Sequence, residues 1–144
     1  NNTASMKIII INGPNLNLTG TREPEIYGTS TFSQIVAQLQ SAFPNITLEY
    51  FQSNSEGVLI DKLHEVGFNY DGIILNPGGY SHTSIALADA IKAINTPVIE
   101  VHLSNIASRE TFRHHTYTGA NCVGIISGLG IKGYKSAIDF FISE

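Results

Sequence analysis

Apolar and polar positions divide this chain into two kinds of segment. Short apolar runs occupy positions 7–11, 73–75, 97–101 and 122–126, and such runs are typical of parallel strands covered on both faces. The stretch 46–52 instead alternates apolar and polar residues, which favours an edge strand. Longer segments with helical periodicity separate these runs. Strands that alternate with helices predict a parallel sheet with helices on both faces.

Start signals accompany two of the four predicted helices. Thr31–Gln34 fits a capping box, in which the Thr hydroxyl and the Gln side chain pair with free amides, and Ser53–Glu56 offers a second one. A third helix is expected to open at Ser81-His82. The apolar faces contain, in chain order, Phe32, Ile35, Val36, Leu39 and Phe43; Leu59, Leu63 and Val66; Leu87, Ile91 and Ile94; and Tyr134, Ala137, Ile138 and Phe141.

The predicted fold is a three-layer α/β sandwich around a five-stranded parallel sheet of order 2-1-3-4-5. The runs at 7–11 and 73–75 are the most apolar, so they are placed at its centre. With 144 residues, one domain over residues 6–144 is expected. Residues 1–5 precede Met6, a plausible initiator, and are interpreted as a remnant of cloning.

Two connections stand out by their length. Residues 12–30 form nineteen residues without helical period between the first strand and the first helix, where about 2–6 are usual and longer loops tend to be functional. Leu16, Leu18, Ile26 and Tyr27 in it argue against a solvated linker and suggest a lid. The stretch 104–113 predicts a short helix or capped turn.

Polar residues follow three of the strands, at the edge of the sheet where doubly wound folds bind ligands. The first strand leads to Asn12 and Asn15, with Arg22 and Tyr27 on the long loop. The third and fourth strands lead to a further set of polar side chains: Asn76, His82, Glu100, His102, Ser104, Arg109 and Arg113. Gly78 and Gly79 lack a Cβ, so their amides could approach a ligand closely.

Charge distinguishes this edge from the rest of the chain. The net charge is −4, which argues against general nucleic-acid binding, yet three of the eight basic residues lie in these stretches. A locally cationic pocket favours an anionic substrate, especially a carboxylate held by a guanidinium. The alternatives are a structural ion pair for Glu100 and His102, and a solvated face for Arg109 and Arg113.

Composition narrows the class of protein. No apolar run reaches the ~20 residues that span a bilayer, and no secretory signal pattern is present, so a cytoplasmic protein without membrane contact is expected. The single cysteine, Cys122, rules out an internal disulfide and is expected to pack in the interior. Charged residues make up 14%, against about 25% in typical domains, which hints at burial between subunits.

Several kinds of site do not fit the motifs. His114-His115 lacks a third ligand at a suitable spacing, so no metal site is predicted. The glycines form neither a Walker loop nor a dinucleotide fingerprint. A phosphoacceptor receiver needs acidic residues where Asn12 and Asn76 stand. A flavodoxin needs a hydroxyl-rich phosphate loop after the first strand, where this chain has Asn-Gly-Pro-Asn-Leu-Asn.

Five blocks together resemble type II 3-dehydroquinate dehydratases: Ile11–Leu16, Arg22–Gly28, Asn76–Ser84, Ile99–Asn105 and Arg109–Arg113. The resemblance runs from Met6 to the end of the chain. It implies a flavodoxin-like fold and an anti elimination of water from 3-dehydroquinate, through an enolate and without metal or cofactor. The product would be 3-dehydroshikimate, in aromatic biosynthesis through the shikimate pathway or in quinate breakdown.

The resemblance also implies a role for each residue. Tyr27 would take the proton beside the ketone, with its pKa lowered by Arg22 and Arg109, and Asn15 would hold a water against the enolate oxygen. His102, oriented by Glu100, would protonate the departing hydroxyl. A tyrosine titrates near ~10 and becomes a base at neutral pH only beside positive charge.

Binding and assembly complete the implied picture. The ring hydroxyls would be bound by Asn76, His82 and Arg113, and the carboxylate by Leu103 and Ser104. Asp89 would reach a neighbouring subunit's site in trimers that assemble four at a time into a dodecamer. A different class remains as the alternative, namely a non-catalytic flavodoxin-like module that binds a nucleotide or an anionic regulator.

Overall fold

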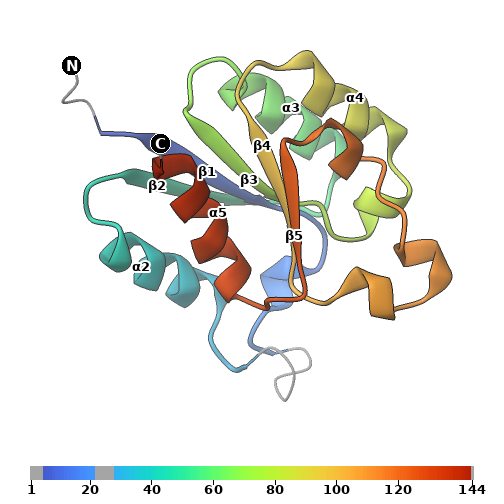
Figure 1. Cartoon of the computed structure of the whole chain (residues 1–144), viewed down its shortest axis with the longest axis horizontal. Coiled ribbons are helices and arrows are strands. Elements are labelled where there is room, and N and C mark those ends of the chain that lie inside the picture. Colours follow the sequence, from blue (N-terminus) through green and yellow to red (C-terminus); the bar gives the residue numbers. More distant parts are fainter. Residues whose placement is uncertain (1–4, 22–27, 144) are drawn as a thin grey trace.

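The structure is a computed structural model that describes residues 5–21 and 28–143. Its five strands form one parallel sheet in the order β2-β1-β3-β4-β5 (Figure 1), so the predicted order 2-1-3-4-5 is confirmed. The strands are β1 (Lys7–Asn12), β2 (Thr47–Gln52), β3 (Gly72–Asn76), β4 (Val98–His102) and β5 (Gly124–Ser127). The α-helices of the described residues are α2 (Phe32–Ala42), α3 (Glu56–Val66), α4 (Ile85–Ala93) and α5 (Lys132–Ile142).

The central strand β1 is buried from both sides. Successive side chains of a strand point to opposite faces, so Ile8 and Ile10 join one apolar layer while Ile9 and Ile11 join the other. The first layer lies under α2 and α5, and the second lies under α3 and α4 (Figure 1). This is the three-layer α/β arrangement that the sequence predicts.

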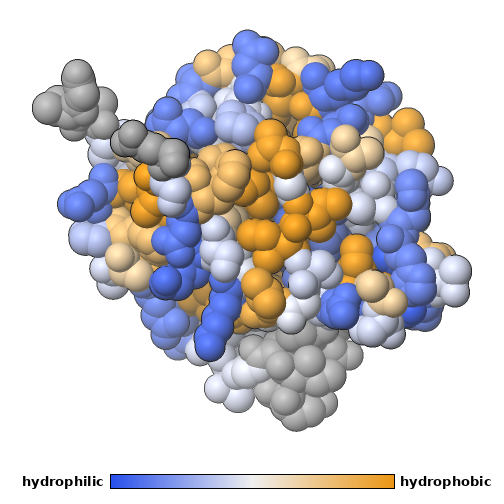
Figure 2. Space-filling view, in the orientation of Figure 1, coloured by the Kyte–Doolittle hydropathy of each residue, from blue (hydrophilic) through white to orange (hydrophobic). Residues whose placement is uncertain are grey.

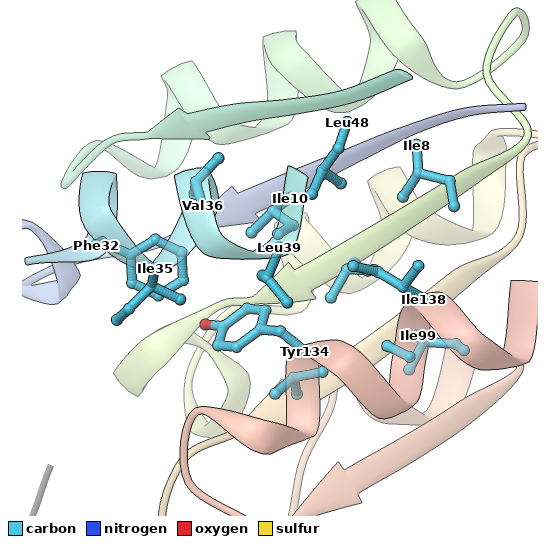
Figure 3. Packing of buried hydrophobic residues seen from close by; sticks show 13 residues of the cluster. Ile8, Ile10, Phe32, Ile35, Val36, Leu39, Leu48, Ile99, Tyr134 and Ile138 are labelled. Atoms are coloured by element: carbon cyan, nitrogen blue, oxygen red, sulfur yellow. The ribbon is translucent and has the colours of Figure 1, made fainter. Parts of the chain in front are cut away.

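In the first layer, the ring of Tyr134 from α5 packs between the helices and the sheet (Figure 3). Its edge contacts the ring of Phe32 from α2, with the centroids 5.0 Å apart. The Tyr134 hydroxyl points towards the carboxyl ends of β1 and β3 (Figure 3), where it finds polar partners described below. The layer therefore connects the last helix to the functional edge of the sheet.

The two predicted capping boxes have different outcomes. The box at α2 is confirmed, because the Thr31 hydroxyl accepts from the Gln34 amide and the Gln34 side chain accepts from the Thr31 amide. The box at Ser53–Glu56 is wrong. Ser55 caps α3 instead, by accepting from the Val58 amide at 3.3 Å, and the carboxylate of Glu56 accepts from the Ser84 hydroxyl.

Two further boundaries differ from the prediction. Residues Gly78–His82 form a 3-10 turn, and α4 begins only at Ile85, because the Ser84 hydroxyl accepts from the Leu87 amide and so caps the helix there. The last strand begins at Gly124 rather than at Cys122, because a 3-10 turn at Gly119–Asn121 still holds the Cys122 amide.

Other expectations are met more closely. The stretch 104–113 contains two 3-10 turns, Ile106–Ser108 and Thr111–Arg113. Cys122 packs against the second apolar layer, and burial raises the pKa of its thiol above the ordinary range. Within residues 5–21 and 28–143, no helix has the length and apolar character needed to cross a membrane.

Candidate active site

A cavity of about 240 Å³ lies beyond the carboxyl ends of β1, β3 and β4. This is the edge where doubly wound sheets bind ligands. The walls of the cavity are formed by the turns that follow these strands and by the segment after β4: Pro14, Asn15, Leu16, Leu18, Thr19, Asn76, Gly78, Gly79, His82, His102, Leu103, Ser104, Ile106, Arg109 and Arg113.

The turns after β1 and β3 lie against each other at the floor of this edge. The Gly13 amide donates to the Asn76 carbonyl at 2.7 Å, and a Cβ on Gly13 would stand 2.6 Å from the Pro77 carbonyl oxygen. Only glycine permits this approach. Gly78 has a φ of +59°, and its backbone amide donates to the Asn76 side-chain oxygen. The sequence suggests that this amide could approach a ligand, but in the structure it is already paired.

Glu100 and His102 form a pair on the face of β4 that carries the second apolar layer. The Glu100 carboxylate is fully buried, and it accepts from His102 Nε2 at 2.7 Å, from Thr116 Oγ1 at 2.7 Å and from Thr118 Oγ1. Because a carboxylate accepts hydrogen bonds, Nε2 is the protonated ring nitrogen. Nδ1 has no hydrogen-bond partner among the described residues, so it is the ring nitrogen that is accessible to a ligand.

His82 stands next to this pair. Its Nδ1 lies 2.8 Å from the carbonyl oxygen of His115 and therefore donates, which leaves Nε2 as an acceptor. The rings of His82 and His102 are nearly parallel, with their centroids 6.1 Å apart. Two imidazoles thus face the cavity with their tautomers set by their neighbours.

A buried chain of hydrogen bonds holds the amide of Asn76. Asn76 Nδ2 donates to the Tyr134 hydroxyl at 3.0 Å, and that hydroxyl donates to Asn12 Oδ1 at 2.9 Å. All three residues are buried, and burial raises the pKa of Tyr134 well above its usual range. The Asn76 amide is therefore fixed in orientation, with the Gly78 amide on its oxygen and Tyr134 on its nitrogen.

Two guanidinium groups border the cavity. Arg109 donates to the Ser104 hydroxyl at 3.2 Å, and Arg113 donates from Nε to the Glu110 carboxylate at 3.1 Å. A hydrogen bond from its own backbone amide, and then the Arg113 side chain, hold the pKa of Glu110 below its usual range. The guanidinium side chains are 40% and 28% exposed, so both remain within reach of an anion that enters the cavity.

The structure brings eight of the twelve predicted site residues to one cavity: Asn15, Asn76, His82, His102, Leu103, Ser104, Arg109 and Arg113. Glu100 lies directly behind His102. Asp89 is exposed on α4 and is not part of the cavity wall. Arg22 and Tyr27 lie outside the described residues.

Sequence reasoning missed the residues that support this wall from behind. Thr116 and Thr118 contact the Glu100 carboxylate from a segment that has no regular pattern, so nothing in the sequence pointed to them. Tyr134 was predicted only as part of an apolar face. Its one available signal was a polar hydroxyl at a core position, which needs a partner when it is buried.

These features define a class. A flavodoxin-like α/β domain that presents a histidine–carboxylate pair beside two arginines, at the ligand edge of its sheet, is a small-molecule enzyme.

Comparison with known proteins gives the family. The family model for dehydroquinase class II matches residues 6–142. A 3-dehydroquinate dehydratase of Actinobacillus pleuropneumoniae is 51% identical over 140 residues, which is 96% of this chain and 91% of that protein. A catabolic 3-dehydroquinase of Aspergillus clavatus is 52% identical over 134 residues, which is 92% of this chain and 89% of that protein.

A solved structure agrees with these relatives. The type II dehydroquinase of Butyrivibrio crossotus superimposes with a TM-score of 0.91 at 47% identity, over 96% of this chain and 99% of that one. The chain belongs to the class II dehydroquinase family, and it is therefore an enzyme of the hydro-lyase type.

Proposed function

We propose that this chain removes water from 3-dehydroquinate, giving 3-dehydroshikimate by an anti elimination through an enolate. The observation that carries this proposal is the cavity in which a histidine–carboxylate pair faces the same space as two arginines. Relatives about half identical to the chain bear the names 3-dehydroquinate dehydratase and catabolic 3-dehydroquinase. No metal or organic cofactor takes part in the proposed reaction.

His102 acts as the general acid for the departing hydroxyl in this proposal. Its bond to Glu100 uses Nε2 and leaves Nδ1 for the substrate. The two threonines that donate to the Glu100 carboxylate hold it in place, and the carboxylate in turn orients the imidazole towards the cavity. The same pair in a purely structural role would not need a cavity in front of the imidazole.

Tyr27 is the proposed base, and Arg22 and Arg109 favour its phenolate form. A guanidinium suits this purpose because it stays charged at any physiological pH. Asn15 is proposed to hold a water molecule against the enolate oxygen, and its position in the cavity wall supports that role.

The ring of the substrate is proposed to bind between His82, Asn76 and Arg113. The fixed amide of Asn76 and the accepting Nε2 of His82 suit hydroxyl groups. The substrate carboxylate is proposed to lie against the backbone amides of Leu103 and Ser104. The hydroxyl of Ser104 already accepts from Arg109, so a carboxylate there would meet a hydroxyl and a positive charge together.

A spectroscopic assay tests the activity directly. The product is a conjugated enone, so incubation with 3-dehydroquinate is expected to produce an ultraviolet absorbance that grows with time and protein concentration. Activity should survive dialysis against a chelator, as no metal is required. Failure to form the enone would instead favour the non-catalytic binding module. A crevice filled by side chains would also favour that module, whereas the structure has an open cavity there.

We place the reaction in the shikimate pathway of aromatic amino acid and chorismate biosynthesis, in the cytoplasm. The single cysteine of the chain fits a reducing compartment. Quinate breakdown uses the same reaction. If the role is biosynthetic, deletion of the gene in the source organism should cause a requirement for aromatic amino acids. A deletion strain that loses only growth on quinate would assign the enzyme to quinate breakdown.

We also propose that the chain assembles into trimers and that four trimers form a dodecamer. The edge strand β5 supports an assembly, because Ile125 in it is 45% exposed and Val123, just before it, is 60% exposed. Figure 2 shows an apolar area over this strand. Asp89 would then act in a neighbouring subunit's site. Sedimentation combined with activity measurement tests this, and a fully active monomer would contradict it.

A further inference from the structure

The loops that follow β1, β2 and β3 are joined by one residue outside the cavity wall, Asn54. Its side-chain oxygen accepts from the Asn15 amide at 3.1 Å and from Gln52 Nε2 at 3.1 Å. Its carbonyl oxygen accepts from the Tyr80 hydroxyl at 2.8 Å. Gln52 also donates to the Gly13 carbonyl at 3.1 Å, so the β2 loop holds the β1 loop at two points.

Asn15 needs such support because its backbone is in an unfavourable conformation. It has a φ of 71° and a ψ of −5°, and it is the one non-glycine residue with a positive φ among residues 5–21 and 28–143. Asparagine tolerates this region better than most residues, but the conformation persists only where the surroundings impose it. The backbone amide of Asn15 donates to the Asn54 side chain, and the Asn15 carbonyl accepts from the Leu18 amide. These two hydrogen bonds fix the peptide groups on both sides of Asn15.

We propose that Asn54 is a positioning residue for catalysis. By binding the backbone amide of Asn15 it holds this residue in the left-handed conformation and thereby keeps the side-chain amide of Asn15 in the cavity. The inference rests on the proposed role of Asn15 at the enolate oxygen. A donor that acts on charge developing in the transition state must be held within a fraction of an ångström, and a small misplacement slows the reaction without weakening substrate binding.

The competing explanation is that Asn54 only stabilises the start of α3. The structure separates the two roles, because the cap of α3 is the next residue, Ser55, whose hydroxyl accepts from the Val58 amide. Ser55→Ala is therefore a matched control. It removes the helix cap and should lower the unfolding midpoint, while kcat stays as in the wild type.

Asn54→Ala is expected to lower kcat by about ten- to a hundredfold, with KM nearly unchanged. Asn54→Asp keeps an acceptor oxygen at the same place and should restore kcat to within about threefold of the wild type. Hydrogen exchange of the segment 13–18 gives a second measurement that does not depend on activity. The Asn15 amide should exchange faster in Asn54→Ala than in the wild type or in Ser55→Ala.

A double-mutant cycle decides whether Asn54 acts through Asn15. Asn15→Gly keeps the left-handed backbone accessible but removes the amide group, so it should be slow by itself. Adding Asn54→Ala to it should then cost no further activity. A full multiplicative loss in the double variant, or a wild-type kcat in Asn54→Ala, would overturn the proposal. Wild-type kcat in Asn15→Gly would refute the role of Asn15 itself, and a wild type that forms no enone would refute the activity.

Discussion

Replacing the Glu100 carboxylate by an amide is the most informative test of the proton-donating pair. Glu100 Oε2 accepts from both His102 and Thr116, whereas Oε1 accepts from Thr118 alone. In Glu100→Gln, the amide oxygen is expected to take the place of Oε2, and the amide nitrogen faces the Thr118 hydroxyl, which can rotate to accept. The contact with His102 therefore survives in a neutral form.

The expected loss follows from the change of acceptor. A hydrogen bond to a charged group contributes about 1.5–3 kcal/mol, against about 0.5–1.5 kcal/mol for a neutral one. The imidazolium form of His102 thus loses roughly 1–1.5 kcal/mol of support, which corresponds to about a tenfold lower kcat. His102→Ala removes the acid itself, and general acid catalysis contributes about 100- to 10,000-fold.

Two rates measured on the same variants separate the steps. Enone absorbance reports elimination, and proton NMR in deuterium oxide reports exchange of the hydrogen beside the ketone. His102→Ala should slow elimination more than exchange, and Glu100→Gln should show a milder form of that difference. The assignment fails if His102→Ala slows both rates equally, or if Glu100→Gln is as slow as His102→Ala.

Three tyrosine-to-phenylalanine variants test other parts of the molecule. Tyr27→Phe should lower kcat by several decades in steady-state assays with little change in KM, and a tenth of the activity remaining would point to another base. Tyr134→Phe leaves a buried oxygen of Asn12 unpaired, so urea unfolding should show a loss of about 1–3 kcal/mol, together with a higher KM because Asn76 is no longer held. A hydrogen bond to Glu49, and then burial, raise the pKa of Tyr70 to about 12. A raised pKa stabilises the fold below about pH 10 and loses this effect between pH 10 and about 12, so the unfolding free energy of Tyr70→Phe should fall less steeply over that interval.

The order of the strands could be predicted because burial on both faces leaves a plain mark in the sequence. The four consecutive isoleucines Ile8–Ile11 contribute alternately to the apolar layers on the two faces of the sheet, and such a run is typical of a central strand. The start of α3 could not be predicted in the same way. Ser53 and Ser55 both suit a cap. In the structure Ser55 caps the helix, and Glu56 pairs with Ser84, the distant residue that caps α4.

The site shows the same division between local and distant causes. Glu100 and His102 are two apart on one strand, so their shared face follows from the period of the strand. The partners of Glu100 come from residues 16 and 18 positions later, in a segment without a period. The orientation of Asn76 depends on how α5 packs on the sheet, and no local pattern contains that information.

The hydrogen bond from Tyr134 to Asn12 joins residues 122 positions apart. This separation has a consequence for folding during synthesis on the ribosome. A ribosome makes the chain from its N-terminus, and a domain generally folds as a unit. Strands β1, β3 and β4 are complete long before Tyr134 is added, but the amide that faces the cavity has no fixed orientation until then. A nascent chain stalled before α5 should therefore be unable to bind substrate, and competence should appear only when nearly the whole chain has been synthesised.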